Sequence, residues 1–233
     1  MRVYRVLVTH LTRMRGDHVC VAGIDTAGRN VRPVLRYQPF TRSHVVPSGK
    51  LMVGSVIEFV GNPRPAPPEV EDIVIDGSPD YFARIPDDHF FEIVERRSSP
   101  SLAAAFGPVL VSRRNNRAAV DVGGGTASLA HLVPTDCELT RRSSEIRLGF
   151  TDPGLGPVDA PVTDLRLFDP DGSVRGPVAR SVGLRLQNRS RVVLAVGLSR
   201  AFQAGRDDHP RHWLQVNNLH FEDYFDDHPS FRL

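Results

Sequence analysis

Arginine is the residue type that most distinguishes the first part of this sequence. The first 64 residues contain ten basic side chains against three acidic ones, a net charge of +7, whereas the whole chain carries only +2. The remaining residues therefore carry a net charge of −5. This bias favours an anionic partner for the first half, because clustered cations attract phosphate-rich ligands. A codon bias toward arginine is the alternative, since the chain has 28 arginines and one lysine.

The candidate nucleic-acid-binding residues are five arginines and two rings, namely Arg13, Arg15, Arg29, Arg32, Arg36, Tyr37 and Phe40. The first two arginines fall in an expected hairpin loop, and the other three surround Pro33. Because alternate residues of a strand share a face, Arg32 and Arg36 should point the same way. Exposed rings beside such arginines would stack on bases and complete a platform for single-stranded nucleic acid. The alternative is that these arginines are ordinary surface charges on an edge strand.

A possible second site in the other half consists of Thr163, Asp164, His212 and Trp213. If Asp164 and His212 met in a cleft, a carboxylate and an imidazole could perform acid–base chemistry on a nucleotide or modified base. However, the sequence has no GxSxG elbow and no Ser-x-x-Lys motif. We therefore assign no catalytic residue; a non-enzyme is favoured, and an enzyme stays open as an alternative.

Other motifs have structural interpretations. Gly123, Gly124 and Gly125 follow a strand but lack the lysine of a phosphate-binding loop, which predicts a tight turn. The acidic, histidine-containing residues from 207 onward match no metal-ligand spacing and are expected to be solvated. Cys20 and Cys137 do not form a metal-spaced pair and are expected to be free, small apolar side chains. No metal and no cofactor are predicted.

Short apolar segments separated by turn residues predict a chain that is mostly β with minor α. Strands are expected at residues 3–9, 19–24, 30–35, 55–60, 70–75, 118–122, 128–133, 138–142, 145–150, 162–168, 183–187, 192–198 and 213–221. Because a proline cannot donate to a strand ladder, 30–35 should be an edge or bulged strand. Short helices are expected at 87–96 and 101–106. The strand spacing favours two small barrels, comprising residues 1–105 with its helices and residues 106–233.

No apolar segment approaches the roughly 20 residues of a membrane helix, and no export signal is evident. With only two cysteines, a reducing cytoplasmic location is the simplest interpretation, without membrane contact.

Several segments resemble the bacterial dual OB-containing domain family. They are CVAGIDTAGRNVRPVL (20–35), GSVIEFVG (54–61), PVTDLRLF (161–168), VVLAVGLSRAF (192–202) and HWLQVNNLHFED (212–223). The resemblance extends over nearly the whole chain and implies two small OB-like β-barrels in tandem, with short helices between them. Asn30 departs from the large apolar or aromatic residue expected there, which argues against a stacking ring at that position. The family implies a fold more than a function, although OB-folds commonly bind oligonucleotides.

Three functions follow from these observations. The leading one is a module that binds single-stranded nucleic acid or a nucleotide through the arginines of the first barrel, accessory to a bacterial conflict or nucleic-acid-processing system. The second is a protein-interaction or assembly module, including a homo-oligomer, that uses exposed strand edges. The third is the enzyme described above, which requires Asp164 and His212 to converge.

Overall fold

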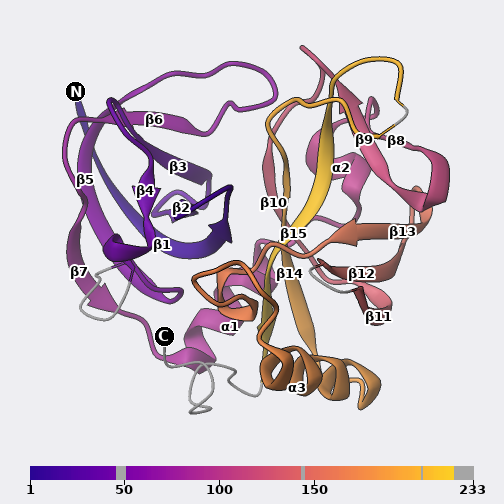
Figure 1. The fold of residues 1–233 in the computed structure, drawn as a ribbon. Coiled ribbons are helices and arrows are strands. Elements are labelled where there is room, and N and C mark those ends of the chain that lie inside the picture. The colour runs from indigo at the N-terminus through magenta and orange to yellow at the C-terminus, as the bar shows by residue number, and fades with distance from the viewer. Residues whose placement is uncertain (46–50, 143–144, 206, 223–233) are drawn as a thin grey trace.

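The first half of the chain is a closed five-stranded barrel of the OB-like type (Figure 1). The computed structural model describes residues 1–45, 51–142, 145–205 and 207–222. The barrel strands, in spatial order, are β1 (Arg2–Arg13), β2 (His18–Asp25), β3 (Asn30–Leu35), β6 (Asp72–Ile75) and β5 (Ser55–Pro63). Pairing of β1 with both β2 and β5 closes the barrel, and β3 and β6 run parallel. Alternate apolar side chains such as Val6, Val8 and Ile57 fill its interior.

Strand β3 was predicted to be an edge or a bulged strand, and the edge alternative is wrong. It pairs with β2 on one side and with β6 on the other. The Arg32 amide donates to the Glu71 carbonyl at 2.9 Å, which turns the Pro33 nitrogen toward β2. Registered pairing of β3 with β2 covers only Asn30 and Val31, so Pro33 interrupts no ladder on that side. The absence of an amide donor at Pro33 is tolerated because the pairing of β3 with β2 ends at Val31, before the proline.

Short elements extend the first barrel and lead to the second. They are β4 (Phe40–Thr41), η1 (Arg42–His44), β7 (Asp80–Arg84), α1 (Asp87–Arg96) and α2 (Leu102–Phe106). Both helices agree with the sequence prediction. Phe90, Phe91 and Val94 of α1 pack into the first core, whereas Leu102 and Phe106 of α2 pack into the second. The change of core thus falls between α1 and α2, and the division of the chain after residue 105 stays a prediction.

The second half repeats the same barrel order with different strands. Its elements are β8 (Val111–Ser112), η2 (Arg114–Asn116), β9 (Ala118–Asp121), β10 (Leu129–Leu132), β11 (Thr135–Arg142), β12 (Glu145–Asp152), β13 (Gly156–Pro161), η3 (Leu165–Leu167), α3 (Gly176–Gln187), β14 (Val192–Leu198) and β15 (Arg211–Phe221). A meander, β11-β12-β13, is joined to β15 by a parallel bridge between Val162 and Val216. Strand β14 then connects β15 to β10, which leads directly into β11. The fold is therefore mostly β, as predicted, with two OB-like barrels in tandem.

Two predicted strands of the second half are wrong. Residues 183–187 belong to helix α3, because Val178, Ala179, Val182 and Leu186 lie at helical spacing and are buried on one face. Residues 162–168 form only isolated bridges, at Val162, Asp164 and Phe168, around η3. The Asp164 carboxylate accepts the Arg166 amide and caps that turn.

The glycine triplet lies between β9 and β10, in agreement with the predicted turn. Gly123 has φ +82° and Gly125 has φ +89°, in the left-handed region that side chains other than glycine rarely adopt. Among the described residues, no helix is long and apolar enough to cross a membrane.

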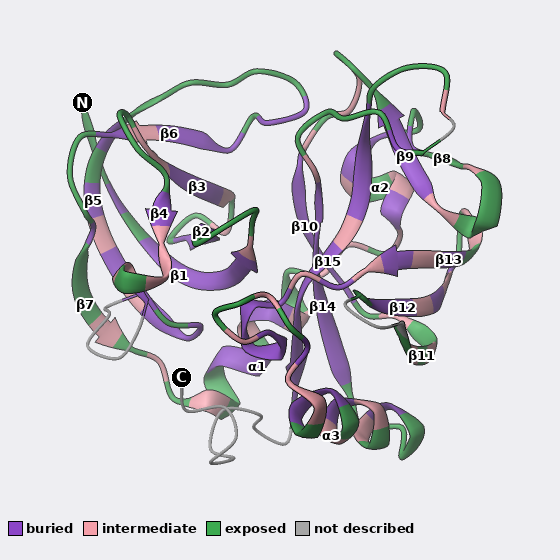
Figure 2. Cartoon of the chain, in the orientation of Figure 1, coloured by how far each residue is buried: buried purple, intermediate pink, exposed green. Residues whose placement is uncertain are grey.

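The two barrels meet along a polar seam between β1 and β15. The Leu11 amide donates to Asn218 Oδ1 at 2.6 Å, and His220 Nε2 donates to the Thr9 carbonyl at 2.9 Å. The Arg13 amide donates to the Thr163 carbonyl at 2.8 Å. The strands that line this seam are buried along most of their length (Figure 2). Hydrogen bonding across β1 and β15 therefore fixes one barrel against the other.

Three buried histidines occupy the middle of the seam. The His10 ring centroid lies 4.9 Å from that of His131, which in turn lies 6.4 Å from that of His220. Burial, with a smaller contribution from the charge of Arg32, lowers the pKa of His10 to about 4. Burial also lowers the pKa of His131 and of His220. The neighbouring histidines lower the pKa of His131 further, and the charges of Arg166 and His10 do the same for His220.

This cluster predicts a loss of stability in acid. Below the ordinary pKa of 6.5, these histidines bind protons in the unfolded chain but stay neutral in the folded one. The free energy of unfolding is therefore retained above pH 6.5 and decreases as the pH falls toward 4. For His10 alone the loss approaches about 3 kcal/mol. Urea unfolding at a series of pH values measures it. His131→Leu should flatten the profile, and the exposed control His18→Gln should not. An unfolding free energy that does not change across this range would contradict the expectation.

Candidate nucleic-acid interface

The three predicted arginines around Pro33 are engaged by acidic side chains. Arg29 Nη2 lies 2.7 Å from Asp25 Oδ2, and Arg32 Nε lies 2.5 Å from Asp72 Oδ1. Arg36 forms an ion pair with Asp76, and this hydrogen bond lowers the pKa of the Asp76 carboxyl. Their acidic partners come from the first barrel itself, which reduces the positive field that the composition predicts.

The predicted groove along β3 is not an open surface. The Arg32 side chain is buried because its face of the sheet is covered by the second barrel, where Arg200 also reaches Asp72 at 3.0 Å. Phe40 is only 3% exposed and packs in the first core, so the expectation of an exposed ring there is wrong. Tyr37, in contrast, is 86% exposed. Arg32 and Arg36 therefore do not share an accessible face.

A different group of arginines gathers where the two barrels meet at the loop before α3. Arg13, Arg42 and Arg175 lie at this loop, and we call them, together with Arg15 of the β1–β2 loop, the seam arginines. The Arg13 guanidinium lies 4.0 Å from the ring centroid of Phe168, and its Nη1 donates to the Gly172 carbonyl at 2.8 Å. Arg42 Nη2 donates to the Asp169 carbonyl at 3.0 Å. Arg175, from the second barrel, lies 3.6 Å from the Asp169 carboxylate.

Burial, neighbouring arginines and nearby carboxylates together determine the electrostatics of this loop. Burial lowers the pKa of Arg13. Burial also lowers the pKa of Arg42, and the charges of Arg13 and Arg175 lower it further while Asp17 and Asp169 oppose them. Arg15 is exposed and makes no side-chain hydrogen bond or ion pair with the described residues. A bound anion would reduce this mutual repulsion, so the cluster is suited to a phosphate group.

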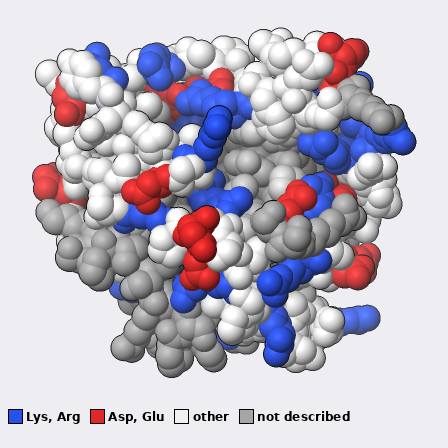
Figure 3. All heavy atoms as spheres, viewed as in Figure 1, with Lys and Arg blue, Asp and Glu red and all other residues white. Residues whose placement is uncertain are grey.

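The molecular surface shows how these charges are distributed on one face. Basic side chains border a hollow at the centre of the view, and acidic side chains are interspersed among them (Figure 3). The face therefore carries mixed charge, with local basic clusters rather than one continuous positive strip.

The predicted residues of the second barrel do not form one site. Asp164 is fully buried, where its Oδ2 accepts the Arg166 guanidinium at 2.7 Å and the Leu219 amide at 3.2 Å. His212 Nδ1 donates to the Ser199 carbonyl at 2.9 Å. Asp164 lies beside the segment from Val216 to Leu219, which begins four residues beyond His212 on β15, so roughly 13 Å of strand or more separates them. The two side chains do not converge as an acid–base pair would require.

The other two predicted residues of the second barrel have structural contacts. Thr163 Oγ1 donates to the Val216 carbonyl at 3.3 Å beside the parallel bridge. Trp213 is buried, and its Nε1 donates to the Phe202 carbonyl at 3.1 Å. Trp213 thereby anchors the loop between β14 and β15 to the barrel.

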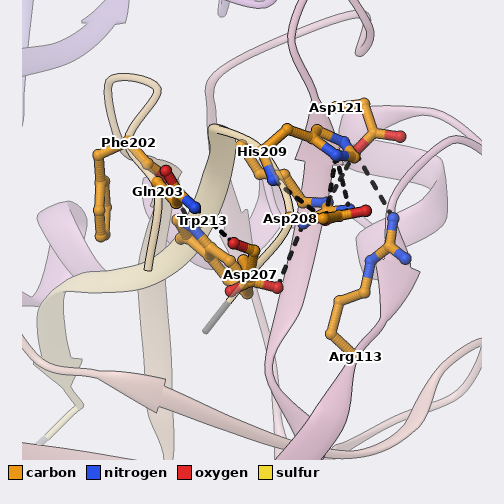
Figure 4. Close-up of polar contacts among 9 residues, drawn as sticks. Arg113, Asp121, Phe202, Gln203, Asp207, Asp208, His209 and Trp213 are labelled. Atoms are coloured by element: carbon orange, nitrogen blue, oxygen red, sulfur yellow. Dashed lines mark hydrogen bonds and ion pairs between the residues drawn. The ribbon is translucent and has the colours of Figure 1, made fainter. Parts of the chain in front are cut away.

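One arginine, Arg211, holds that loop by ion pairs with three aspartates, all three of which are labelled in Figure 4. Arg211 lies 2.8 Å from Asp121, 3.2 Å from Asp207 and 2.8 Å from Asp208. Asp207 and Asp208, from the acidic segment that starts at residue 207, therefore share one cation with Asp121. Within the described residues, no group of three or more His, Cys, Asp or Glu side chains could hold a metal ion. Residues 223–233 of the predicted acidic terminus lie outside the described part of the chain.

Both cysteines are free thiols, as predicted. Burial raises the pKa of Cys20, and burial followed by the charge of Asp136 raises the pKa of Cys137 to about 12. Both thiols are therefore protonated at neutral pH and are not activated as nucleophiles.

Comparisons with known proteins give limited information. No protein-family model matches the chain, and no curated protein matches it. One similar solved structure is a murine DNA-binding protein bound to double-stranded DNA, at 7% identity and a TM-score of 0.32, covering 92% of this chain and 91% of that one. Another is the tetrameric p202 HIN2, at 9% identity and a TM-score of 0.30, covering 94% and 93%. Neither likeness is close enough to support a conclusion about this chain.

The buried Asp164–Arg166 pair gives a stability prediction. Asp164→Asn removes the charge that compensates the guanidinium, and the unpaired buried cation should cost about 3–5 kcal/mol of unfolding free energy. Chemical denaturation measures this loss. Asp169→Asn, at a half-exposed carboxylate in the following loop, is the matched control and should change stability by less than about 1 kcal/mol. Equal effects of the two substitutions would contradict the assignment.

Proposed function

We propose that this chain binds single-stranded nucleic acid or a nucleotide, and that the seam arginines hold its phosphates. The observation that carries the proposal is the convergence of Arg13, Arg42 and Arg175 on one loop from both barrels, with the pKa of Arg13 and Arg42 lowered. Cations crowded in this way gain most from an anionic ligand. Arg15, exposed in the neighbouring β1–β2 loop, adds a fourth positive charge.

The fold supports the same proposal by analogy. OB-folds bind oligonucleotides with their strand face and the loops at its ends. Here the second barrel covers much of that face in the first barrel, which leaves loop residues such as Arg15 and Tyr37 for a ligand. Phosphate contacts would dominate the affinity, and the Tyr37 ring would stack on a base.

The wider assignment belongs to the same proposal. We infer that the chain is a cytoplasmic member of the bacterial dual OB-containing domain family, accessory to a conflict or nucleic-acid-processing system. The tandem OB-like barrels support this inference. The proposed binding requires no cofactor and no membrane.

Binding should depend strongly on salt and on the seam arginines. The affinity for a labelled oligothymidylate, measured by fluorescence anisotropy, should fall steeply between about 50 and 200 mM salt. Arg15→Gln together with Arg42→Gln should weaken binding and reduce the slope of log affinity against log salt by about one per lost phosphate contact.

The matched control for this experiment is Arg36→Gln, which removes an exposed arginine of the same barrel that already pairs with Asp76. Its affinity and salt slope should match the wild type. A flat salt response, or equal losses in the control and in the seam variant, would refute the proposed site.

A second candidate function, assembly with a protein or a second copy, rests on a different surface. Val3 and Val60 are neighbours in the β1–β5 register, and both are exposed. Phe82 of β7 is also exposed, with Arg5 stacked on its ring at 4.3 Å. Among the described strands, β7 pairs only with β5. Exposed apolar side chains beside a strand edge are typical of an interaction surface.

The assembly function predicts a concentration-dependent dimer. Light scattering after size exclusion should give a dimeric mass for the wild type and a monomeric mass for Val60→Asp, because a buried charge opposes association. Leu184→Asp, on the exposed face of α3, should leave the dimer intact. A monomeric wild type at all concentrations tested would remove this candidate.

A further inference from the structure

An exposed aromatic ring is held rigidly at the rim of the second barrel. The Phe202 side chain is 47% exposed, yet its backbone exchanges two hydrogen bonds with Arg211, at 3.0 and 3.1 Å. The Phe202 carbonyl also accepts the Trp213 indole. In Figure 4 the ring stands clear of the polar network around Arg211. Exposure of a large apolar group on a fixed backbone is unfavourable in water, so the position is suited to a ligand.

The surface next to this ring is also built for planar groups. The Arg117 guanidinium lies 4.0 Å from the Trp213 ring centroid, and that ring is 6.4 Å from Phe202. Burial lowers the pKa of Arg117, with the charge of Arg147 adding to the effect. A guanidinium stacked on an indole presents its own flat face, which bases stack on as they do on a ring.

The charges near the stacking surface are mixed in sign, and they include one exposed arginine. Arg114, three residues before Arg117, is exposed and makes no side-chain hydrogen bond or ion pair with the described residues. The nearby carboxylates of Asp121, Asp207 and Asp208 are each bound by Arg211. Arg211, together with Arg113 at 3.5 Å from Asp121, offsets two of these three negative charges, and Arg114 remains available to a phosphate.

We propose that Phe202, Arg117 and Arg114 form a second nucleic-acid site, which takes an unpaired base on the Phe202 ring and its phosphate on Arg114. The site rests on the proposed function and deepens it, because it would select single strands over duplexes. In a duplex the bases are already stacked on one another, so only an unpaired base can lie on an exposed ring.

The test compares an oligothymidylate of about 15 nucleotides with a duplex of equal length. Phe202→Ala should weaken single-strand binding about tenfold and change duplex binding less than about twofold. Phe202→Leu, which keeps an apolar side chain without the ring, should lose single-strand affinity similarly. Trp213 is the only tryptophan of the sequence, so its emission reports the site directly and should change when the wild type binds the single strand.

Phe82→Ala is the matched control, since Phe82 is likewise an exposed phenylalanine but lies on the first barrel. It should bind as the wild type does. Wild-type affinity in both Phe202 variants, or unchanged Trp213 emission on binding, would overturn the second site while leaving the seam arginines in place. Failure of the wild type to bind either ligand would instead overturn the proposed function, and this inference with it.

Discussion

The hydrogen-bonded seam between β1 and β15 is the constraint on which the rest of this structure depends. Backbone and amide groups of Leu11 and Asn218 pair across it, and the Asp164 carboxylate closes its end by binding both Arg166 and the Leu219 amide. Buried polar groups of this kind are costly unless every partner is present, so they permit very few relative positions of the two barrels. The seam also brings Arg13 and Arg175 to the same loop, although 162 residues separate them in the sequence. The candidate site is therefore a product of barrel–barrel packing.

The sequence predicted the class of fold well and the functional surface only in part. Alternation of apolar residues in β1, β2 and β14 identified strands, and the aspartates and arginines flanking α1 identified a helix. Helix α3 was missed because Gly183 and the valines before it have strand-like composition, whereas its apolar face is evident only over the full twelve residues. A window of five residues was therefore too short to reveal the helical period, and its local composition indicated a strand instead.

The arginine platform illustrates a second limit of sequence reasoning. Counting charges identified a basic first half, but it could not show that Asp72 and Asp76 return to Arg32 and Arg36 across a parallel strand pair. Phe40 was expected to be exposed because the residues next to it in the sequence do not indicate that it packs in the core. The signal for Arg42 and Arg175 was weaker still, since each follows an ordinary turn. Long-range strand pairing decides which arginines are available to a ligand. Local patterns in a single sequence do not reveal that pairing.

The wide sequence separation across the seam has a consequence for how the protein is made. All five strands of the first barrel are complete by residue 75, whereas the partner residues on β15 are synthesised more than 200 residues after β1 begins. During that interval the polar side of the first barrel, including His10 and Thr12, faces water without its permanent covering. Because these residues are polar, the nascent barrel does not expose an aggregation-prone apolar sheet to other chains. The composition of the seam thus suits translation as well as the finished fold.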